Sequence, residues 1–197
     1  GTGTTDRIDA GKRPASTALA RSIVAHVYFN GAGGGSPGRV FQDSAGTGLD
    51  NGDEAVWYLV GGLSYVRRSS GGTGQWRSSS LPTGWSCTGI SLDESATGTT
   101  PAFYVDGISS AEIATSSTSG SYLNVGTNLT WGNRSSDNAR NWDGLIGPVA
   151  FFDALLTANE HRSLAANIWQ IFEEEDFGYY AAAGGGSYTL TADSGSF

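Results

Sequence analysis

The sequence predicts an all-β protein, an antiparallel β-sandwich that carries one short helix near its carboxyl end. The composition is rich in glycine, serine and threonine and includes eight Tyr, eight Phe and six Trp, whereas only 15% of the residues are charged. Such a chain suits short strands and turns better than long helices. Turn residues also recur at intervals of about eight to twelve residues, which is typical of a sandwich or barrel.

The length indicates how many domains the chain forms, and the charge and hydropathy argue against some classes of partner. A chain of 197 residues suits one sandwich domain with some extra length. The net charge of −8 argues against nucleic acid as a partner, because phosphate binding needs a basic surface. No apolar run approaches the length that crosses a bilayer, so we expect no membrane partner. The absence of methionine, even at position 1, predicts a processed product or an excerpt of a longer polypeptide.

Alternating apolar and polar residues predict strands along the first half of the chain. These strands are residues 6–9, 21–30, 39–44, 55–60 and 63–66. The glycine-rich residues 31–38 predict a hairpin between the second and third strands, and Gly61-Gly62 predicts a second hairpin. An acidic turn is expected at residues 50–54. The basic doublet Arg67-Arg68 is interpreted as a solvated strand edge.

The second half of the chain continues this pattern. Strands are predicted at residues 86–92, 102–106, 122–125, 129–132 and 145–152. Residues 69–74 predict a loop, and residues 109–121 a long exposed connection of Ser, Thr and Gly. Cys87 is the only cysteine, which excludes an intrachain disulfide and predicts a small buried residue in a strand.

The segment from residue 141 to residue 172 organises the end of the chain. Its strand is apolar on both faces, which predicts an interior position, and Phe151 and Phe152 point to opposite faces. Thr157 and Glu160 fit a capping box that starts a helix over residues 158–167, with Leu164 on its buried side. Trp169, Ile171 and Phe172 are then predicted to anchor the segment to the body.

The same segment resembles the closing signature of laminin-G-like domains, which belong to the concanavalin A-like jelly rolls. The matching run is Gly144-x-Ile146-x-x-Val149-x-x-Phe152-x-x-x-Leu156-x-x-x-Glu160-x-x-x-Leu164. Gly84-Trp85, Asp93 and residues 103–107 resemble the middle hairpin of that family. The resemblance spans residues 5–170 and implies a jelly-roll sandwich that a short helix closes at one end.

Beyond the helix the composition changes. We expect residues 1–172 to form the sandwich and residues 173–197 to form a linker and the start of a C-terminal strand or further domain. Tyr188 and Leu190 alternate as in a strand, and a lone strand needs a sheet edge, so they predict an extended assembly arm. Residues 187–197 and residues 167–172 resemble segments of tailed-bacteriophage virion proteins that carry such a sandwich.

No catalytic constellation is evident, and we expect no enzyme. Glycoside hydrolases of this superfamily need two carboxylates facing each other across a sugar, whereas the densest acidic cluster, residues 173–176, follows the helix. His26 and His161 have no serine or cysteine nucleophile motif beside them. The glycines at 31–38 lack the lysine of a phosphate loop.

Calcium is the one cofactor considered, because many laminin-G-like domains hold this ion at the rim with aspartates and backbone carbonyls. The candidate ligands in predicted loops are Asp43, Asp106, Asp137 and Asp143. Ordinary turn aspartates are the alternative interpretation.

Aromatic residues near turns are the main indication of binding, since sugars stack on aromatic faces and hydrogen-bond to amides. The candidate glycan-binding residues are Trp57, Tyr58, Trp76, Trp131, Asn133 and Trp142. A sandwich of this size also needs large residues in its core, so half of these tryptophans are expected there.

Three functional hypotheses follow. The favoured one is a non-catalytic structural protein on the surface of a tailed-phage virion, a head decoration or tail component. It would contact other capsid or tail subunits, form homo-oligomers and touch surface glycans. The alternative is a secreted or surface carbohydrate-binding or adhesion domain. A glycoside hydrolase with degenerate spacing is the third.

Overall fold

The computed structural model describes residues 8–11, 20–31, 38–44, 54–59, 62–78, 84–96, 98–116, 118–123, 128–133 and 140–172. Side chains are described throughout these ranges except at residues 9–11, 44, 55–59, 114, 115 and 128. The predicted residues 173–197 of the linker and arm, with Tyr188 and Leu190, lie outside the described part.

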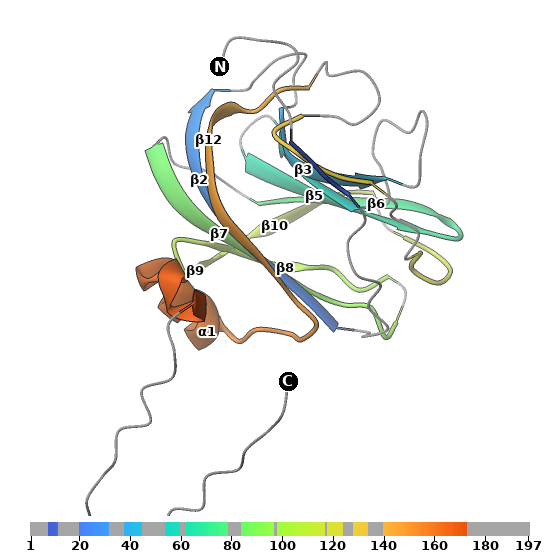
Figure 1. Cartoon of the computed structure of the whole chain (residues 1–197). Helices are drawn as coiled ribbons and strands as arrows, with labels where there is room; N and C mark the ends of the chain where they lie inside the picture. Colours follow the sequence, from blue (N-terminus) through green and yellow to red (C-terminus); the bar gives the residue numbers. More distant parts are fainter. Residues whose placement is uncertain are drawn as a thin grey trace, which may run out of the picture.

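Two antiparallel sheets pack face to face, which confirms the jelly-roll β-sandwich (Figure 1). Within the described residues, one sheet has the order β1-β11-β3-β4-β5-β6-β10 and the other the order β12-β2-β7-β8-β9. The first sheet comprises β1 (Ile8–Gly11), β11 (Asn128–Trp131), β3 (Arg39–Ser44), β4 (Glu54–Leu59), β5 (Gly62–Ser69), β6 (Gly72–Ser78) and β10 (Glu112–Ser116). The second comprises β12 (Asp143–Phe152), β2 (Ala20–Gly31), β7 (Gly84–Asp93), β8 (Ala102–Val105) and β9 (Ile108–Ser110).

Strand β2 contributes side chains to both faces of the five-stranded sheet. Ile23, Val27 and Phe29 point inward and belong to the main core between the sheets. Because side chains alternate along a strand, Val24 and His26 point to the outer face. The main core comprises Ile23, Ala25, Val27, Phe29, Val40, Phe41, Leu63, Tyr65, Trp76, Ile90, Leu92, Phe103, Leu129 and Trp142.

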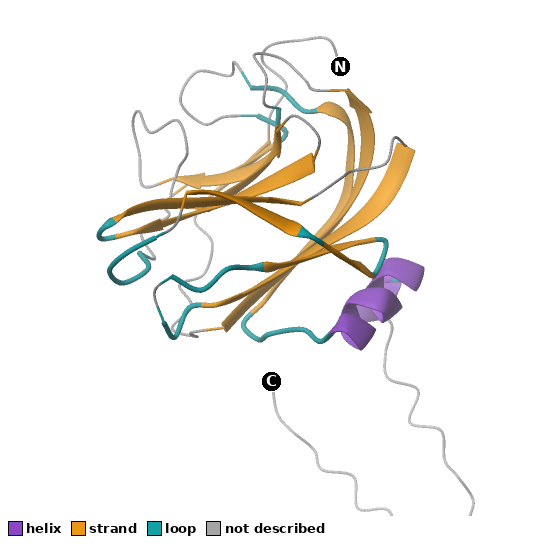
Figure 2. Ribbon diagram, turned by 180° about the vertical axis from the view of Figure 1, so that it is seen from behind, coloured by secondary structure: helices purple, strands orange, loops and turns teal. Residues whose placement is uncertain are grey.

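Helix α1 (Ala158–Ala166) and the 3₁₀ helix η1 (Ile168–Phe172) lie outside the strands, at one end of the five-stranded sheet (Figure 2). The capping box is confirmed, since Thr157 Oγ1 accepts from Glu160 N and Glu160 Oε2 accepts from Thr157 N. A second apolar cluster lies beneath the helices, made of Val24, Cys87, Leu164 and Ile168 with Phe152, Leu156, Ala165 and Ile171. Neither helix among the described residues is long and apolar enough to cross a membrane.

His161 connects helix α1 to the five-stranded sheet through a hydrogen bond and a ring-stacking contact. Its Nε2 lies 2.8 Å from Ser91 Oγ, which in turn lies 2.8 Å from Ser22 Oγ. The ring stacks on Tyr104 with 4.0 Å between centroids. Gly89 lies beneath this ring, and a Cβ at that position would collide with the imidazole, so the close approach requires glycine. Burial lowers the pKa of His161 to about 4, partly offset by Glu160, because the charged ring is poorly solvated here.

Several predicted strands are confirmed, but two predicted pairings are wrong or shifted. The hairpin between β2 and β3 does not form, because β2 pairs with β12 and β7 while β3 pairs with β11 and β4 in the opposite sheet. The β4–β5 hairpin exists with Leu59 opposite Gly62, so Gly62 begins a strand instead of lying in the predicted turn.

Three further expectations are corrected by long-range pairing. The predicted loop at residues 69–74 is mostly strand, since β5 ends at Ser69 and β6 begins at Gly72. The predicted exposed connection over residues 109–121 contains β10, which pairs with β6. Among the described strands, β12 lies at the edge of its sheet rather than in the interior. It is apolar on both faces because the core covers one face and the helices cover part of the other.

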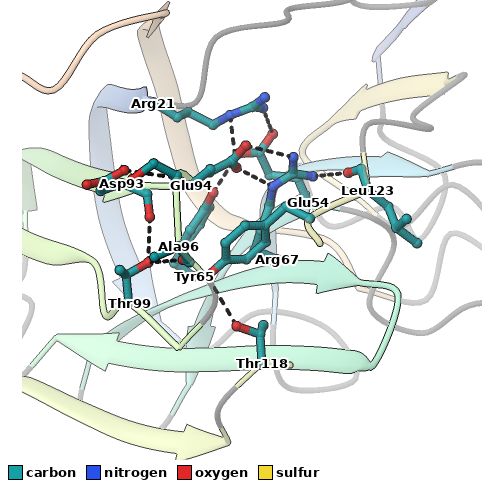
Figure 3. A network of polar contacts seen from close by, with 12 residues as sticks. Arg21, Glu54, Tyr65, Arg67, Asp93, Glu94, Ala96, Thr99, Thr118 and Leu123 are labelled. Atoms are coloured by element: carbon teal, nitrogen blue, oxygen red, sulfur yellow. Dashed lines mark hydrogen bonds and ion pairs between the residues drawn. The ribbon is translucent and has the colours of Figure 1, made fainter. Parts of the chain in front are cut away.

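A buried network of charges joins the two sheets at one end of the sandwich (Figure 3). Arg21 on β2 donates to Glu54 on β4 at 2.6 Å. Arg67 on β5 donates from Nε and Nη2 to the two oxygens of Glu94, which follows β7, at 2.6 and 3.2 Å. Arg21 Nε also lies 3.4 Å from Glu94 Oε1. All four charged side chains are at most 6% exposed.

This network corrects two interpretations of the sequence. Arg67 does not lie on a solvated edge, and Glu54 is not part of an exposed acidic turn. The hydroxyl of Tyr65 donates to Glu54 at 2.7 Å. Burial, with the charge of Glu54, raises the pKa of Tyr65 well above its usual range, so the phenol remains a donor. Burial alone would lower the pKa of Arg67, but Glu54 and Glu94 raise it, so Arg67 stays charged.

Replacement of Glu54 by glutamine tests this network. We expect Glu54→Gln to lower the free energy of unfolding by about 3–5 kcal/mol, because it removes the carboxylate nearest to buried Arg21, which must then share Glu94 with Arg67. Urea denaturation measures the change. The matched control, Asp153→Asn, removes an exposed carboxylate and should stay within about 0.5 kcal/mol of the parent protein. Equal stability of the two variants would contradict the structural role.

The pH dependence of stability tests the docking of His161. The folded pKa of about 4 lies below the ordinary value of 6.5, so the unfolded chain binds a proton first as the pH falls. The contribution of His161 is therefore complete above pH 6.5 and declines by up to about 3 kcal/mol toward pH 4. Unfolding measured from pH 8 to 4 should show this loss in the parent protein but not in His161→Gln. Parallel pH profiles for the two proteins would refute the assignment.

Candidate functional site

Three of the predicted glycan-binding residues are buried and cannot meet a ligand at the surface. Trp76 and Asn133 are 0% exposed and Trp142 is 6% exposed. Trp76 stacks on Tyr65 in the main core. Trp142 donates from its indole nitrogen to Tyr28 O at 3.2 Å, and Asn133 accepts from the Arg140 backbone at 2.9 Å. These side chains contribute to the packing and internal hydrogen bonding of the fold.

Of the other three predicted residues, only Trp131 has a described side chain. Trp131 is half-buried and packs beside Phe41 and Phe151. Trp57 and Tyr58 lie on β4, and their side chains are outside the described part. The described side chains of the predicted set are therefore buried or half-buried and do not form an exposed site.

The candidate calcium ligands are also dispersed. Asp43 is buried on β3. Asp106 occupies the β8–β9 turn with φ of 51°, and its Oδ1 accepts from Cys87 N at 2.8 Å and Ser86 Oγ at 3.1 Å. Asp143 opens β12 and accepts from Asn30. Asp137 lies outside the described residues, among which no group of three or more His, Cys, Asp or Glu could hold a metal ion.

A different set of residues forms an open groove of about 710 Å³ on the outer face of the five-stranded sheet. We call it the aromatic groove. Its lining residues are His26, Trp85, Gly147, Pro148, Trp169 and Phe172. Two elements build it, the sheet on one side and η1 on the other.

The sheet wall follows from strand order and register. Strands β12, β2 and β7 are neighbours, and Leu145, Tyr28 and Trp85 face one another across them. A bulge between Ile146 and Val149 places two residues of β12 opposite one residue of β2. These two residues are Gly147 and Pro148, and they lie opposite His26.

Trp85 is the central aromatic side chain of the sheet wall. It is 50% exposed, and its ring centroid lies 5.0 Å from that of His26 and 5.7 Å from that of Tyr28. A Cβ on Gly147 would lie 3.0 Å from His26 O and 3.5 Å from the Trp85 ring. Even a Cβ would therefore press against the His26 carbonyl, so glycine permits the close approach of β12 to His26 and Trp85.

The second wall comes from η1, where the expected anchoring is confirmed for Ile171 and is wrong for Trp169 and Phe172. Trp169 is 60% exposed and Phe172 is 69% exposed, and their rings lie 6.0 Å apart. A 3₁₀ helix has about three residues per turn, so residues three apart share a side. Ile168 and Ile171 occupy the side that packs beneath the helix. Trp169 and Phe172 consequently project together on the adjoining side.

The chemistry of the aromatic groove is that of a stacking surface. Among the described residues its lining contains no Asp, Glu, Lys or Arg, and its side-chain polar groups are the His26 imidazole and the two indole N–H groups. Such a surface can bind apolar faces and donate a few hydrogen bonds. Sequence alternation could have indicated Trp85, because Ile90 and Leu92 face inward and place odd-numbered residues of β7 outside.

Comparison with solved structures confirms the fold. The chain resembles the CBM40 domain of Ruminococcus gnavus IT-sialidase bound to α2,3-sialyllactose, with a TM-score of 0.58 and 12% identity over 82% of this chain and 97% of that one. It also resembles the native heptameric SAP-like pentraxin from Limulus polyphemus, with a TM-score of 0.55 and 14% identity over 81% and 75% of the two chains.

Domains LG4-5 of the mouse laminin α1 chain give a TM-score of 0.55 at 13% identity, over 80% of this chain and 42% of that one. The protein therefore has a laminin-G-like jelly-roll fold, as the closing signature implied. No protein-family model matches the chain, and the comparison with curated proteins gives no significant relative.

Proposed function

We propose that this protein is a non-catalytic carbohydrate-binding or adhesion domain that holds glycans in the aromatic groove. The observation that carries the proposal is the exposure of Trp85 and Trp169, at 50% and 60%, along the same groove. Large aromatic rings that are left half in water on a folded protein mark a binding surface.

The size and chemistry of the groove fit a sugar. Its volume of about 710 Å³ lies within the range of about 300–1,000 Å³ usual for small-molecule sites. Sugar rings present C–H faces that stack on indoles, while their hydroxyls remain in water or bond to a few protein groups. His26 and the indole N–H groups supply such partners at the groove.

A hydrolytic role has less support from the described residues. Glycoside hydrolysis needs two carboxyl groups on either side of the scissile bond. The groove lining contains none. Glu54 and Glu94 are buried and hydrogen-bonded to arginines, so neither is placed to touch a sugar at the surface.

The structural neighbours support the same class of function. One of them is a carbohydrate-binding domain in complex with a sialylated sugar, and another is a pair of laminin domains. Their sequence identities with this chain are 12% and 13%, so they support the type of domain and leave the ligand to be found by experiment.

A role on the surface of a tailed-phage virion is a second candidate. It rests on the resemblance of residues 167–172 and 187–197 to virion proteins, and glycan binding would be compatible with it. In this proposal other capsid or tail subunits are the partners, and Tyr188 and Leu190 form the assembly arm. Full-length protein carrying Tyr188→Ser and Leu190→Ser should then fail to join the particle, and unchanged incorporation would contradict the arm's role.

Replacement of Trp85 by alanine tests the proposed function. A glycan array first identifies a bound sugar, and titration calorimetry then measures its affinity. We expect Trp85→Ala to weaken binding about tenfold, because about 1.4 kcal/mol of stacking and burial is lost. The matched control, Ile113→Ala, truncates an exposed apolar residue on β10 in the other sheet and should bind normally. Absence of glycan binding by the folded parent protein would refute the proposal.

A further inference from the structure

We propose, resting on the function above, that the aromatic groove selects neutral oligosaccharides with equatorial hydroxyls, of the β-linked gluco type, over acidic sugars. The selectivity follows from two properties of the described residues, the charge of the lining and the arrangement of its walls.

The charge of the lining disfavours an acidic sugar. A buried or half-buried carboxylate on a ligand is stabilised by arginine, lysine or converging N–H donors. Among the residues that line the aromatic groove there is no arginine or lysine. The whole chain carries a net charge of −8, so its long-range field also repels anions. A sialic acid or uronic acid would therefore lose solvation of its carboxylate here without an ionic partner.

Two arginines near the groove residues in sequence are engaged elsewhere. Arg162 on α1 donates to Asn159 on the same helix at 2.9 Å. Arg21 lies on the inward face of β2 and bonds to Glu54. Among the described residues, neither guanidinium belongs to the groove lining.

The two walls select the shape of a neutral sugar. Trp85 belongs to the sheet wall, whereas Trp169 and Phe172 belong to η1. A ring bound between these walls meets apolar surface on both of its faces. Only a pyranose whose hydroxyls are equatorial presents C–H groups on both faces, because each axial hydroxyl would press a polar group against an aromatic ring and remain unpaired.

The surface next to the groove extends this preference to more than one sugar unit. Leu145 is 58% exposed and faces Tyr28, which in turn faces Trp85 across the sheet. This row continues the apolar wall along the outer face. A linear oligosaccharide with flat, β-linked units follows such a row better than a branched one.

Calorimetry with four soluble probes tests the selectivity on the full chain. The neutral probes are cellotetraose and triacetylchitotriose, lactose is the galactose-containing control, and 3′-sialyllactose is the acidic probe. We expect at least one gluco-type probe to bind tenfold or more tightly than lactose and 3′-sialyllactose. Its affinity should change less than twofold between 50 and 500 mM salt, because no ion pair forms. Trp85→Ala and Trp169→Ala should each weaken it about tenfold, and Ile113→Ala should not.

Three results would overturn the inference. Tighter binding of 3′-sialyllactose that depends on Trp85 would refute the selectivity while leaving the proposed carbohydrate-binding function intact. Equal binding of lactose and the gluco-type probes would refute the role of the two walls. Absence of binding by all four probes and by a glycan array would refute the proposed function itself, and the inference with it.

Discussion

The buried pairing of Arg21 with Glu54 and of Arg67 with Glu94 is the interaction on which the arrangement of the two sheets depends. Arg21 of the five-stranded sheet pairs with Glu54 of the seven-stranded sheet. Arg67 of the seven-stranded sheet pairs with Glu94, which directly follows β7 of the five-stranded sheet. A charge in a dry interior costs several kcal/mol unless a counter-charge and hydrogen bonds stabilise it. Any sliding of one sheet over the other would separate these partners. The network therefore favours one relative position of the layers, whereas the apolar core alone would tolerate several.

Strand β2 links that core to the binding surface. Its inward residues pack between the sheets, and Arg21 continues the same face into the charge network. Its outward residues are divided by the helix. Val24 is covered by Leu164 and Ile168, whereas His26 and Tyr28 lie beyond the helix beside Trp85. The helix is too short to cover the whole outer face, and the uncovered remainder is the sheet wall of the aromatic groove.

The position of η1 couples helix docking to the second wall. Helix α1 is held by the capping box, by Leu164 and by the contact of His161 with Ser91. Because η1 follows α1 after one residue, the same contacts fix where Trp169 and Phe172 project. A groove built from a sheet and a docked helix is more rigid than one built from loops, which reduces the entropy lost when a ligand binds.

The sequence by itself determined the elements that depend on near neighbours. The boundaries of β3, the alternation along β2, the capping box of Thr157 and Glu160 and the buried Cys87 all follow from local periodicity or from contacts three residues apart. Only the tertiary structure decided which strands pair, that Arg67 and Glu54 are buried, and that Trp169 is exposed. Those outcomes depend on partners distant in the chain, since Arg21 and Glu54 are 33 positions apart and Arg67 and Glu94 are 27 positions apart. From the sequence alone, a polar residue is expected to be solvated and a large aromatic residue to be in the core. Whether a distant segment covers the residue or leaves it open is decided only in the tertiary structure.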